Sequence, residues 1–172
     1  AKDLLPVVLT TSQPNVLAVN ANGPAKTLPE FIAWARTQGD KLSYGSVGNG
    51  SSSHLTMELF KGATGIAAVH VPYSGSPPAG TSLAAGETQA LFAVAPALLP
   101  LVQGGRVKLL GVTSLRRLES MPELPTLAEA GVSGFEALAW NGLFAPAGTP
   151  AAVVERINAD VNAVLKDPAV RA

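Results

Sequence analysis

The sequence predicts an α/β protein with a mainly parallel sheet flanked by helices. Short apolar runs typical of buried strands alternate with segments of helical periodicity, and this order favours parallel strands joined by helices. The 17 glycines and 14 prolines mark many turns between these segments. With 47% hydrophobic residues among 172, the chain can bury one ordinary core, or the cores of two small lobes, without disulfides.

The charge balance argues against a strongly electrostatic function. The chain has 12 Lys and Arg against 12 Asp and Glu, and only 14% of its residues are charged. Nucleic-acid binders usually carry a clear basic excess, so no nucleic-acid partner is expected and small or neutral partners are favoured. The absence of cysteine excludes disulfides, thiolate metal sites and a cysteine nucleophile, and it fits either the cytosol or a bacterial periplasm.

The first part of the chain predicts two strands and a helix. Residues 4–10 and 16–20 are rich in Val and Leu, and Gln13-Pro14-Asn15 stands between them as a breaker. Thr27 and Glu30 have the spacing of a capping box, which predicts a helix that ends at Gly39.

The middle of the chain repeats the alternation of strand and helix. The predicted strands cover 42–47, 66–71, 89–94 and 107–113, and the predicted helices run from about 55 to 65, weakly to Gly86, and over 96–103.

The last part predicts a surface connection, an extended run and a final helix. Residues 115–134 are irregular, with one short helix opened by a second capping box at Thr126 and Glu129. Residues 135–144 are extended, and Thr149-Pro150 is expected to cap and start the last helix.

A Gly/Ser-rich junction between a predicted strand and a helix is the most informative segment. It runs from Tyr44 to His54, and its candidate ligand-binding residues are Gly48, Asn49, Gly50, Ser51, Ser52, Ser53 and His54. Glycines allow close approach of a ligand, and a helix start offers unpaired N–H groups to an anion. The loop contains no Lys or Arg and lacks the Gly-Lys-Ser/Thr of a phosphate loop, so it suits a carboxylate better than a polyphosphate. A plain turn with a serine cap remains the alternative.

A second junction is expected at the same edge of the sheet. Tyr73, Ser74 and Gly75 follow a predicted parallel strand, and ligands of open α/β sheets gather where such strands end. Tyr73 is equally well interpreted as a packing aromatic. Trp140 either lines a cleft or anchors a strand, and Trp34 is expected in the core.

No catalytic or cofactor site is predicted. His54 and His70 are the only histidines and lack a third ligand at zinc-site spacing, so no metal or other cofactor is expected. His70 is interpreted as a hydrogen-bonded core residue. The serines at 51–53 with His54 could serve a hydrolase, but adjacent positions point in different directions and no G-x-S-x-G motif is present. The chain is therefore expected not to be an enzyme, with a Ser/His hydrolase kept as the remoter alternative.

The motifs together resemble the Bug family of bacterial solute-binding proteins, the periplasmic receptors associated with tripartite tricarboxylate transporters. The resemblance covers nearly the whole chain. Its segments are Lys26-Thr27-Leu28-Pro29-Glu30-Phe31, Leu42-Ser43-Tyr44-Gly45-Ser46, Gly48-x-Gly50-Ser51-Ser52-Ser53-His54-Leu55, Val69-His70-Val71-Pro72-Tyr73, Val112-Thr113-Ser114, residues 122–131, residues 140–150 and Asp167-Pro168.

The resemblance implies one lobe of a type II periplasmic-binding-protein fold plus part of the other. The nearly complete α/β lobe would cover 15–138, and residues 1–14 and 139–172 would be crossover segments and a remnant of the second lobe. It further implies a periplasmic receptor that serves membrane transporter subunits and binds a small carboxylate, namely a dicarboxylate or tricarboxylate, an amino acid or an aromatic acid. The family's ligand-binding roles carry over to residues 48–54 and 73–75.

The chain departs from the family pattern at both ends. Family members have a further N-terminal segment and further C-terminal residues, so a truncated relative is expected, with weak or absent ligand binding by this chain alone. A homo-dimer through the exposed remnants is expected as well. The effector-sensing domain of a transcription regulator, which shares this architecture, is the main alternative, although no basic helix-turn-helix is seen.

Overall fold

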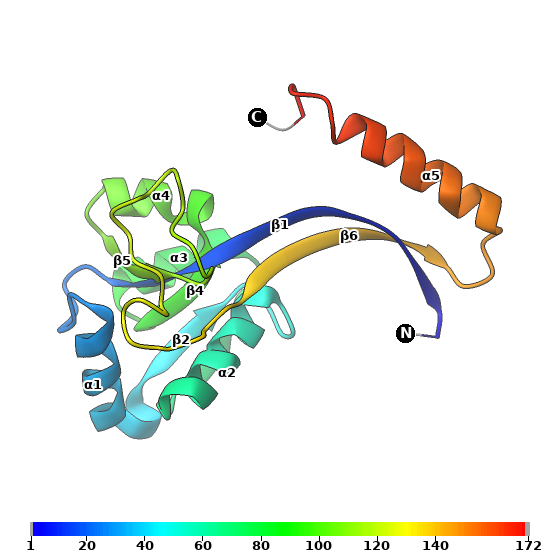
Figure 1. The fold of residues 1–172 in the computed structure, drawn as a ribbon. Coiled ribbons are helices and arrows are strands. Elements are labelled where there is room, and N and C mark those ends of the chain that lie inside the picture. The colour runs from blue at the N-terminus through cyan, green and yellow to red at the C-terminus, as the bar shows by residue number, and fades with distance from the viewer. Residues whose placement is uncertain (1, 171–172) are drawn as a thin grey trace. The chain divides into compact units, whose positions relative to one another are not determined.

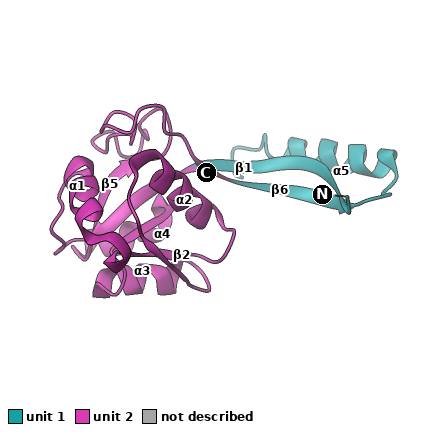
Figure 2. Ribbon diagram, turned by 90° about the horizontal axis from the view of Figure 1, so that it is seen from below, with its two compact units in different colours: residues 1–13, 140–172 teal, residues 14–139 magenta. Residues whose placement is uncertain are grey.

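The computed structural model describes residues 2–170 and divides into two compact units. Unit 1 comprises residues 1–13 and 140–172, and unit 2 comprises residues 14–139 (Figure 2). The strands are β1 (Leu4–Asn20), β2 (Ser43–Ser46), β3 (Val69–Pro72), β4 (Ala90–Val94), β5 (Val107–Val112) and β6 (Leu138–Pro146). The helices are α1 (Leu28–Gln38), α2 (Ser52–Thr64), α3 (Ser76–Ala85), α4 (Ala95–Gln103) and α5 (Ala151–Val164), with a short 3-10 turn, η1 (Gly39–Lys41).

Unit 2 is built on a sheet with the strand order β3-β2-β4-β1-β5 (Figure 1). β2 pairs with β3 and β4 in parallel, whereas β1 is antiparallel to both β4 and β5. Four of these strands therefore run in one direction and β1 alone runs against them, which confirms the predicted α/β fold with a mainly parallel sheet.

Helices cover both faces of this sheet. On one face, Phe31 of α1 and Phe60 of α2 are fully buried in one apolar cluster. On the other face, Leu83 of α3 and Leu98 of α4 belong to a second cluster. Each such side chain stabilises the fold by about 1.5–3 kcal/mol relative to its exposed state.

β1 is one long strand, so the predicted break at Gln13-Pro14-Asn15 is wrong. Pairing with β4 starts at Asn15, opposite Val94. Pro14 thus lies just before this ladder, where its missing N–H removes no bond to β4.

The helix predicted from Thr126 and Glu129 is also wrong, although its capping box forms. The Thr126 amide donates to the Glu129 carboxylate at 2.9 Å, and the Glu129 amide donates to the Thr126 hydroxyl at 3.0 Å. Gly131 then takes a φ of 117°, which no helical residue adopts, so the chain makes only a turn.

Two other predicted helix starts differ in detail. The Thr27 hydroxyl accepts from the Glu30 amide as predicted, but the Glu30 carboxylate accepts from the Lys26 amide instead of that of Thr27. Thr149 does not cap α5, because its hydroxyl donates to the Pro146 carbonyl at 2.8 Å and Pro150 is the N-cap.

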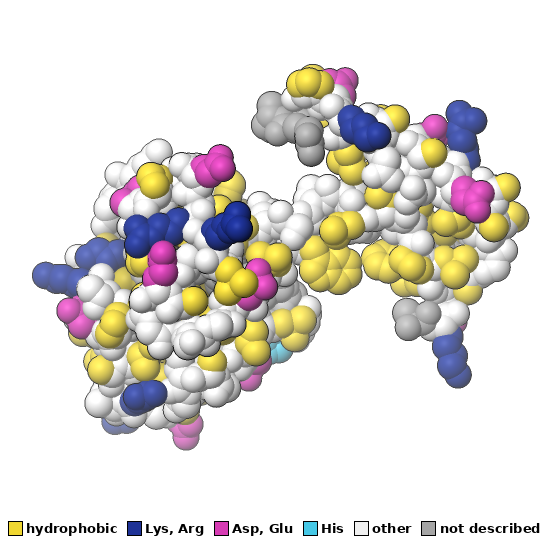
Figure 3. Space-filling view, in the orientation of Figure 1, with side chains coloured by type: hydrophobic (Ala, Val, Ile, Leu, Met, Phe, Trp, Pro, Cys, Tyr) yellow, Lys and Arg dark blue, Asp and Glu magenta, His cyan; other side chains and the backbone are white. Residues whose placement is uncertain are grey.

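Unit 1 contains the paired ends of β1 and β6 together with α5. The Asn158 side chain of α5 donates to the Val7 carbonyl at 2.6 Å, yet no side chain of α5 is buried over residues 151–164. Trp140 is 59% exposed, so it does not act as a buried strand anchor within this unit. Hydrophobic side chains gather over the surface of the unit (Figure 3).

Across residues 2–170, none of the helices combines the length and the apolar character needed to cross a bilayer.

Candidate functional site

The predicted Gly/Ser segment connects the end of β2 to the start of α2. The carboxyl ends of β2, β3 and β4 lie at one edge of the sheet because these strands run in parallel. The Tyr73 amide donates to the Ser46 carbonyl at 3.0 Å, which brings the second predicted segment, residues 73–75, next to the first.

Local geometry explains why this segment needs glycine and serine. Gly48 and Gly50 have φ values of 133° and 72°, which side chains other than glycine's rarely allow. Ser51 is the N-cap of α2, and its hydroxyl accepts from the His54 amide. The same hydroxyl donates to the Gly48 carbonyl at 2.7 Å, which closes the loop on itself.

Several amides of the segment are already bonded within the protein. The Gly48 amide donates to the Ser46 hydroxyl at 3.2 Å, and the Gly50 amide donates to His54 Nδ1 at 3.0 Å. The Ser51 amide donates to the Gly48 carbonyl. These donors hold the loop in shape and are not available to a ligand.

Three amides of the segment have no acceptor among the described residues: those of Asn49, Ser52 and Ser53. Ser52 and Ser53 form the first turn of α2, where the helix dipole favours negative charge by about 0.3–1 kcal/mol at an exposed site. The part of the loop that can receive an anion is therefore smaller than the full set of residues 48–54.

The serine hydroxyl groups of the segment are likewise either bonded within the protein or free of a partner among the described residues. Ser53 is buried, and its Oγ accepts from the Val47 amide at 2.9 Å and contacts Ser51 Oγ. Ser52 is partly exposed and its hydroxyl has no bond to a described residue. Ser52 thus adds one neutral donor beside the open amides.

The two histidines stack beneath the loop. The rings of His54 and His70 lie 3.9 Å apart between centroids, and His70 also stacks on Tyr44 at 4.9 Å. His70 Nε2 contacts the buried Ser46 Oγ at 2.6 Å. Since His54 Nδ1 accepts the Gly50 amide, any ring proton of neutral His54 must sit on Nε2.

His70 is therefore a support of the loop rather than an ordinary core residue. Burial, and then the neighbouring His54, lower the pKa of His70 below its ordinary value of 6.5. A neutral His70 keeps the contact with Ser46, whose hydroxyl in turn accepts from the Gly48 amide.

A polar network continues from Tyr44 to the exposed side of α2. The Tyr44 hydroxyl donates to Glu58 Oε1 at 2.6 Å, and Lys61 Nζ donates to the same oxygen at 2.8 Å. Burial and then Glu58 raise the pKa of Tyr44, whereas hydrogen bonds from Lys61 and Tyr44 lower the pKa of Glu58. The negative charge of Glu58 is thus paired with Lys61.

The sequence places Ser46 in the informative segment and Glu58 one helical turn after His54, but it assigns no role to Ser46, Glu58 or Lys61. The spacing of Glu58 and Lys61 along α2 is a signal for their ion pair. The contact between Ser46 and His70 joins residues of two neighbouring strands, and only the strand register reveals it.

Of the second predicted segment, only Ser74 offers a free polar side chain. The Tyr73 ring packs 3.5 Å from where a side chain of Gly45 would begin, and its hydroxyl donates to Ser82 Oγ at 2.5 Å. The side chain of Tyr73 is thus a packing aromatic, one of the two alternatives. Ser74 is exposed, and Gly75, with a φ of 137°, is the N-cap of α3.

The start of α3 contributes little to anion binding. Its second and third residues are Pro77 and Pro78, which have no N–H, and the Ala79 amide already donates to the Gly75 carbonyl. The start of α2 is therefore much richer in amide donors than that of α3.

The arrangement does not assemble a nucleophile with its base. His54 accepts from a backbone amide, so it is not poised to activate any serine of residues 51–53. The one serine–histidine contact is that of Ser46 and His70, and Ser46 is fully buried. Among residues 2–170, no group of three or more His, Asp or Glu side chains could hold a metal ion.

Comparisons with known proteins agree with this geometry. The model of the TctC family, described as tripartite tricarboxylate transporter family receptor, matches residues 1–172. A protein from the tcbD-tcbE intergenic region of Pseudomonas sp. is 42% identical over 170 residues, which are 98% of this chain and 51% of that protein. The chain thus spans about half the length of this relative.

Solved structures give the same assignment. The R. palustris protein solved with adipate is 37% identical at a TM-score of 0.88, with 98% of this chain and 56% of that chain covered. MatC from Rhodopseudomonas palustris, solved with bound malate, is 33% identical at a TM-score of 0.89, with 98% and 57% covered.

These matches confirm the resemblance to the Bug receptors, and the family consists of transport receptors rather than enzymes, as the sequence predicts. On the strength of the family match over its whole length, the chain belongs to the TctC family of tripartite tricarboxylate transporter receptors.

Proposed function

We propose that the chain forms one ligand-binding lobe of a periplasmic receptor that captures a small carboxylate and presents it to the membrane subunits of a tripartite tricarboxylate transporter. The observation that carries the proposal is the pair of amides of the accessible residues Asn49 and Ser52 at the start of α2, which have no acceptor among the described residues. Adipate and malate in the two similar solved structures are both small dicarboxylates, which supports this ligand class.

The site would hold a carboxylate without a cationic side chain in the loop. Each open amide donates to a carboxylate oxygen, and such charge-assisted bonds are about twice as strong as neutral ones. The hydroxyls of Ser52 and Ser74 are neutral donors within the same segments. Residues 48–54 contain no Lys or Arg and lack the Gly-Lys-Ser/Thr of a phosphate loop, which supports a carboxylate rather than a polyphosphate as the ligand.

We also propose that the isolated chain binds this ligand weakly or not at all. It spans about half the length of a full relative, and a single lobe contacts only one side of a ligand that two lobes would enclose. The loss of donors from the other side would reduce affinity even though the α2 start is fully formed.

The test is isothermal titration calorimetry on two proteins. One is the 172-residue chain; the other is a chimera in which residues 1–172 replace the matching half of MatC. Malate, adipate and the uncharged diamide of adipate serve as ligands. We expect heat with a dicarboxylate only in the chimera and no heat with the diamide.

Two outcomes would contradict the proposal. Equal binding of the diamide and of adipate would mean that the amides do not recognise a carboxylate. Micromolar binding of a dicarboxylate by the isolated chain would leave the carboxylate site standing but would overturn the expected weakness of the single lobe.

A homo-dimer is a further part of the proposal. Leu9, Trp140 and Phe144 of unit 1 are each about half exposed or more, and apolar surface of this extent is commonly covered by a partner. A second copy of the chain is the partner proposed here, through the exposed remnants of unit 1.

A further inference from the structure

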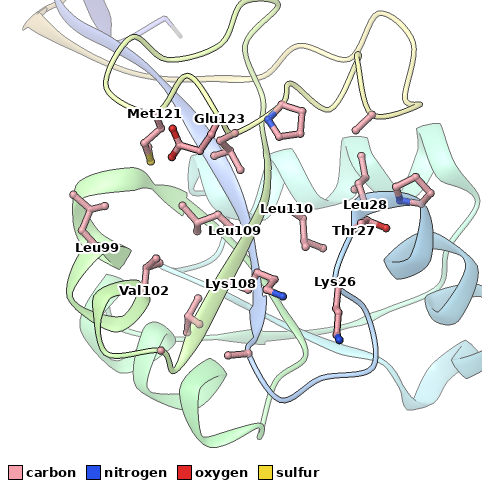
Figure 4. Close-up of a pocket in the computed structure, with 17 residues that line it drawn as sticks. Lys26, Thr27, Leu28, Leu99, Val102, Lys108, Leu109, Leu110, Met121 and Glu123 are labelled. Carbon is pink, nitrogen blue, oxygen red and sulfur yellow. The ribbon is translucent and has the colours of Figure 1, made fainter.

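A groove with a volume of about 800 Å³ runs along the outer side of β5, away from the carboxylate site. Its walls come from the start of α1, from α4 and from the segment around Met121 (Figure 4). Apolar side chains dominate its lining: Leu28, Leu99, Val102, Leu109, Leu110 and Met121.

The floor of the groove is an open sheet edge. β5 is the last strand of the sheet and pairs with β1 on one side only. The Ala21 amide donates to the Arg106 carbonyl, and Val19 pairs with Lys108 two residues further on. Bonded pairs alternate along an antiparallel ladder, so the backbone groups of Val107 and Leu109 point away from β1 and into the groove.

The chain itself already adds a short strand to this edge further along. The Val112 amide donates to the Pro125 carbonyl and the Leu127 amide donates to the Val112 carbonyl, both at 2.9 Å. Gly111 permits this approach, since a Cβ there would lie 2.7 Å from Leu127. Residues 107–110 are the part of the edge that no such segment covers.

Both faces of an added strand would meet apolar walls. Leu110 belongs to the cluster between the sheet and α1, whereas Leu109 and Val102 pack against the cluster on the α4 side. The side chains of an extended peptide alternate between two faces, so such a peptide would place apolar groups against both walls.

The charged side chains at the groove determine which charge the bound segment should carry. Lys26 and Lys108 reach one end, and Glu123 lies near Met121 at the other (Figure 4). Neither lysine has an acidic partner among the described residues. Lysine on an open edge discourages pairing with a second β5, because it would bring like charges together, and it favours carboxylates.

We propose that this edge groove binds an extended, mainly apolar segment of a partner protein, with an Asp or Glu at the end that reaches Lys26 and Lys108, as an additional strand beside β5. The backbone donors and acceptors of Val107 and Leu109, which precede the register shift of β5, distinguish a peptide from a small apolar molecule, which could use only the walls. The interaction is independent of the carboxylate site at the start of α2.

The test uses the full chain labelled with ¹⁵N and a panel of blocked hexapeptides of Val and Leu that carry Asp, Ser or Lys at one end. We expect the Asp members to shift the amide resonances of Val107 and Leu109. Backbone N-methylation of the same peptides removes their strand donors and should weaken binding by about tenfold, the effect of one or two hydrogen bonds.

Two variants sharpen the test. Lys108→Glu should reverse the preference from Asp peptides to Lys peptides, whereas Lys41→Glu, an exposed lysine on η1, should not. Leu109→Pro removes an amide that points into the groove and should abolish binding; circular dichroism checks its fold, and the N-methylated peptides carry the same test if it does not fold.

Three outcomes would overturn the proposal. The first is no shift at residues 107–110 with any Asp peptide. The second is equal binding of the N-methylated peptides, which would mark a site for small apolar molecules. The third is concentration-dependent shifts at these residues without peptide, which would mark a second copy of the chain as the occupant.

Discussion

Gly50 combines a left-handed backbone with open space around it. Its φ is 72°, and nothing lies within 4 Å of the position where a Cβ would be. A substitution there strains only the backbone, at about 1–2 kcal/mol. The strain would act on the loop that we propose as the carboxylate site, with little effect on the core.

We therefore predict that Gly50→Val lowers dicarboxylate affinity in the chimera by at least about tenfold while the protein stays folded. Gly39→Val is the matched control, because Gly39 has a φ of 55° and equally open surroundings but lies at the end of α1. Calorimetry and thermal unfolding of both variants provide the measurements. Equal affinities of the two variants would argue against the assignment of the loop.

The protonation of His70 makes the stability of the folded chain depend on pH. Its pKa is lowered in the folded chain, whereas the unfolded chain binds the proton at an ordinary pKa of 6.5. Below that value the unfolded state takes up more protons, so acid favours unfolding. The stabilising contribution of neutral His70 is complete above pH 6.5 and is lost as the pH falls through the lowered pKa.

We predict that the melting temperature of the wild type falls by a few degrees between about pH 7 and about pH 5.5, and that His70→Gln falls less. Glutamine keeps an amide that can contact Ser46 but does not titrate. Calorimetric scans across this range measure the difference. Parallel pH profiles of the two proteins would show that His70 does not carry the effect.

At the residue scale, the sequence predicts the loop but not the hydrogen bonds that hold it in shape. The glycines, the serine cap and the missing Lys or Arg are all local features, and the loop and its helix start lie where they predict. The bond from Gly50 to His54 and the contact from Ser46 to His70 depend on side-chain direction and strand register. This is why the number of open amides could not be counted in advance.

At the scale of elements, capping and periodicity predict the helices of unit 2 well. The predicted end of the first helix at Gly39 and of the second near Gly65 agree with the C-caps of α1 and α2. The predictions of elements fail where the residues that follow a local signal do not continue the helix. Thr126 and Glu129 form a capping box, but Gly131 ends the segment after one turn. Pro14 suggested a break because pairing partners are invisible in a single sequence.

Helix α5 tests how much a helix depends on burial. It has 14 residues and buries none of them, whereas α2, with 13 residues, buries Met57 and Phe60. Helices of this length are marginal in water without tertiary packing.

We predict that the amides of α5 exchange with deuterium at least about tenfold faster than those of α2, because α5 can open without exposing a core. Mass spectrometry after peptic digestion measures both in one sample, so α2 is the internal control. Equal protection of the two helices would mean that α5 is covered by a partner in solution.

At the scale of the whole molecule, the two units differ in how they satisfy their apolar surfaces. Unit 2 has a buried cluster on each face of its sheet, whereas unit 1 leaves Leu9, Trp140 and Phe144 exposed. Composition predicts a core of ordinary size, but it does not reveal how that core is distributed between two units.

We predict that sedimentation equilibrium detects a reversible dimer and that Leu143→Glu, on β6, shifts it to monomer. Burying a charge against apolar surface is costly, so one such change suffices. Leu59→Glu is the control, since Leu59 is similarly exposed on α2 of unit 2. A wild type that sediments only as a monomer would contradict the predicted dimer. Dissociation of the dimer by Leu59→Glu would place the interface on unit 2 instead of unit 1.

The two prolines at the start of α3 limit the ligands that the proposed receptor can bind on this lobe. Helices α2 and α3 begin side by side at the same sheet edge. Pro77 and Pro78 have no N–H group, so the start of α3 has few backbone hydrogen-bond donors for a ligand. If the start of α2 binds a carboxylate as we propose, the start of α3 is a poor place for the second carboxylate of a dicarboxylate. We therefore expect unit 2 alone not to discriminate between dicarboxylates of different length.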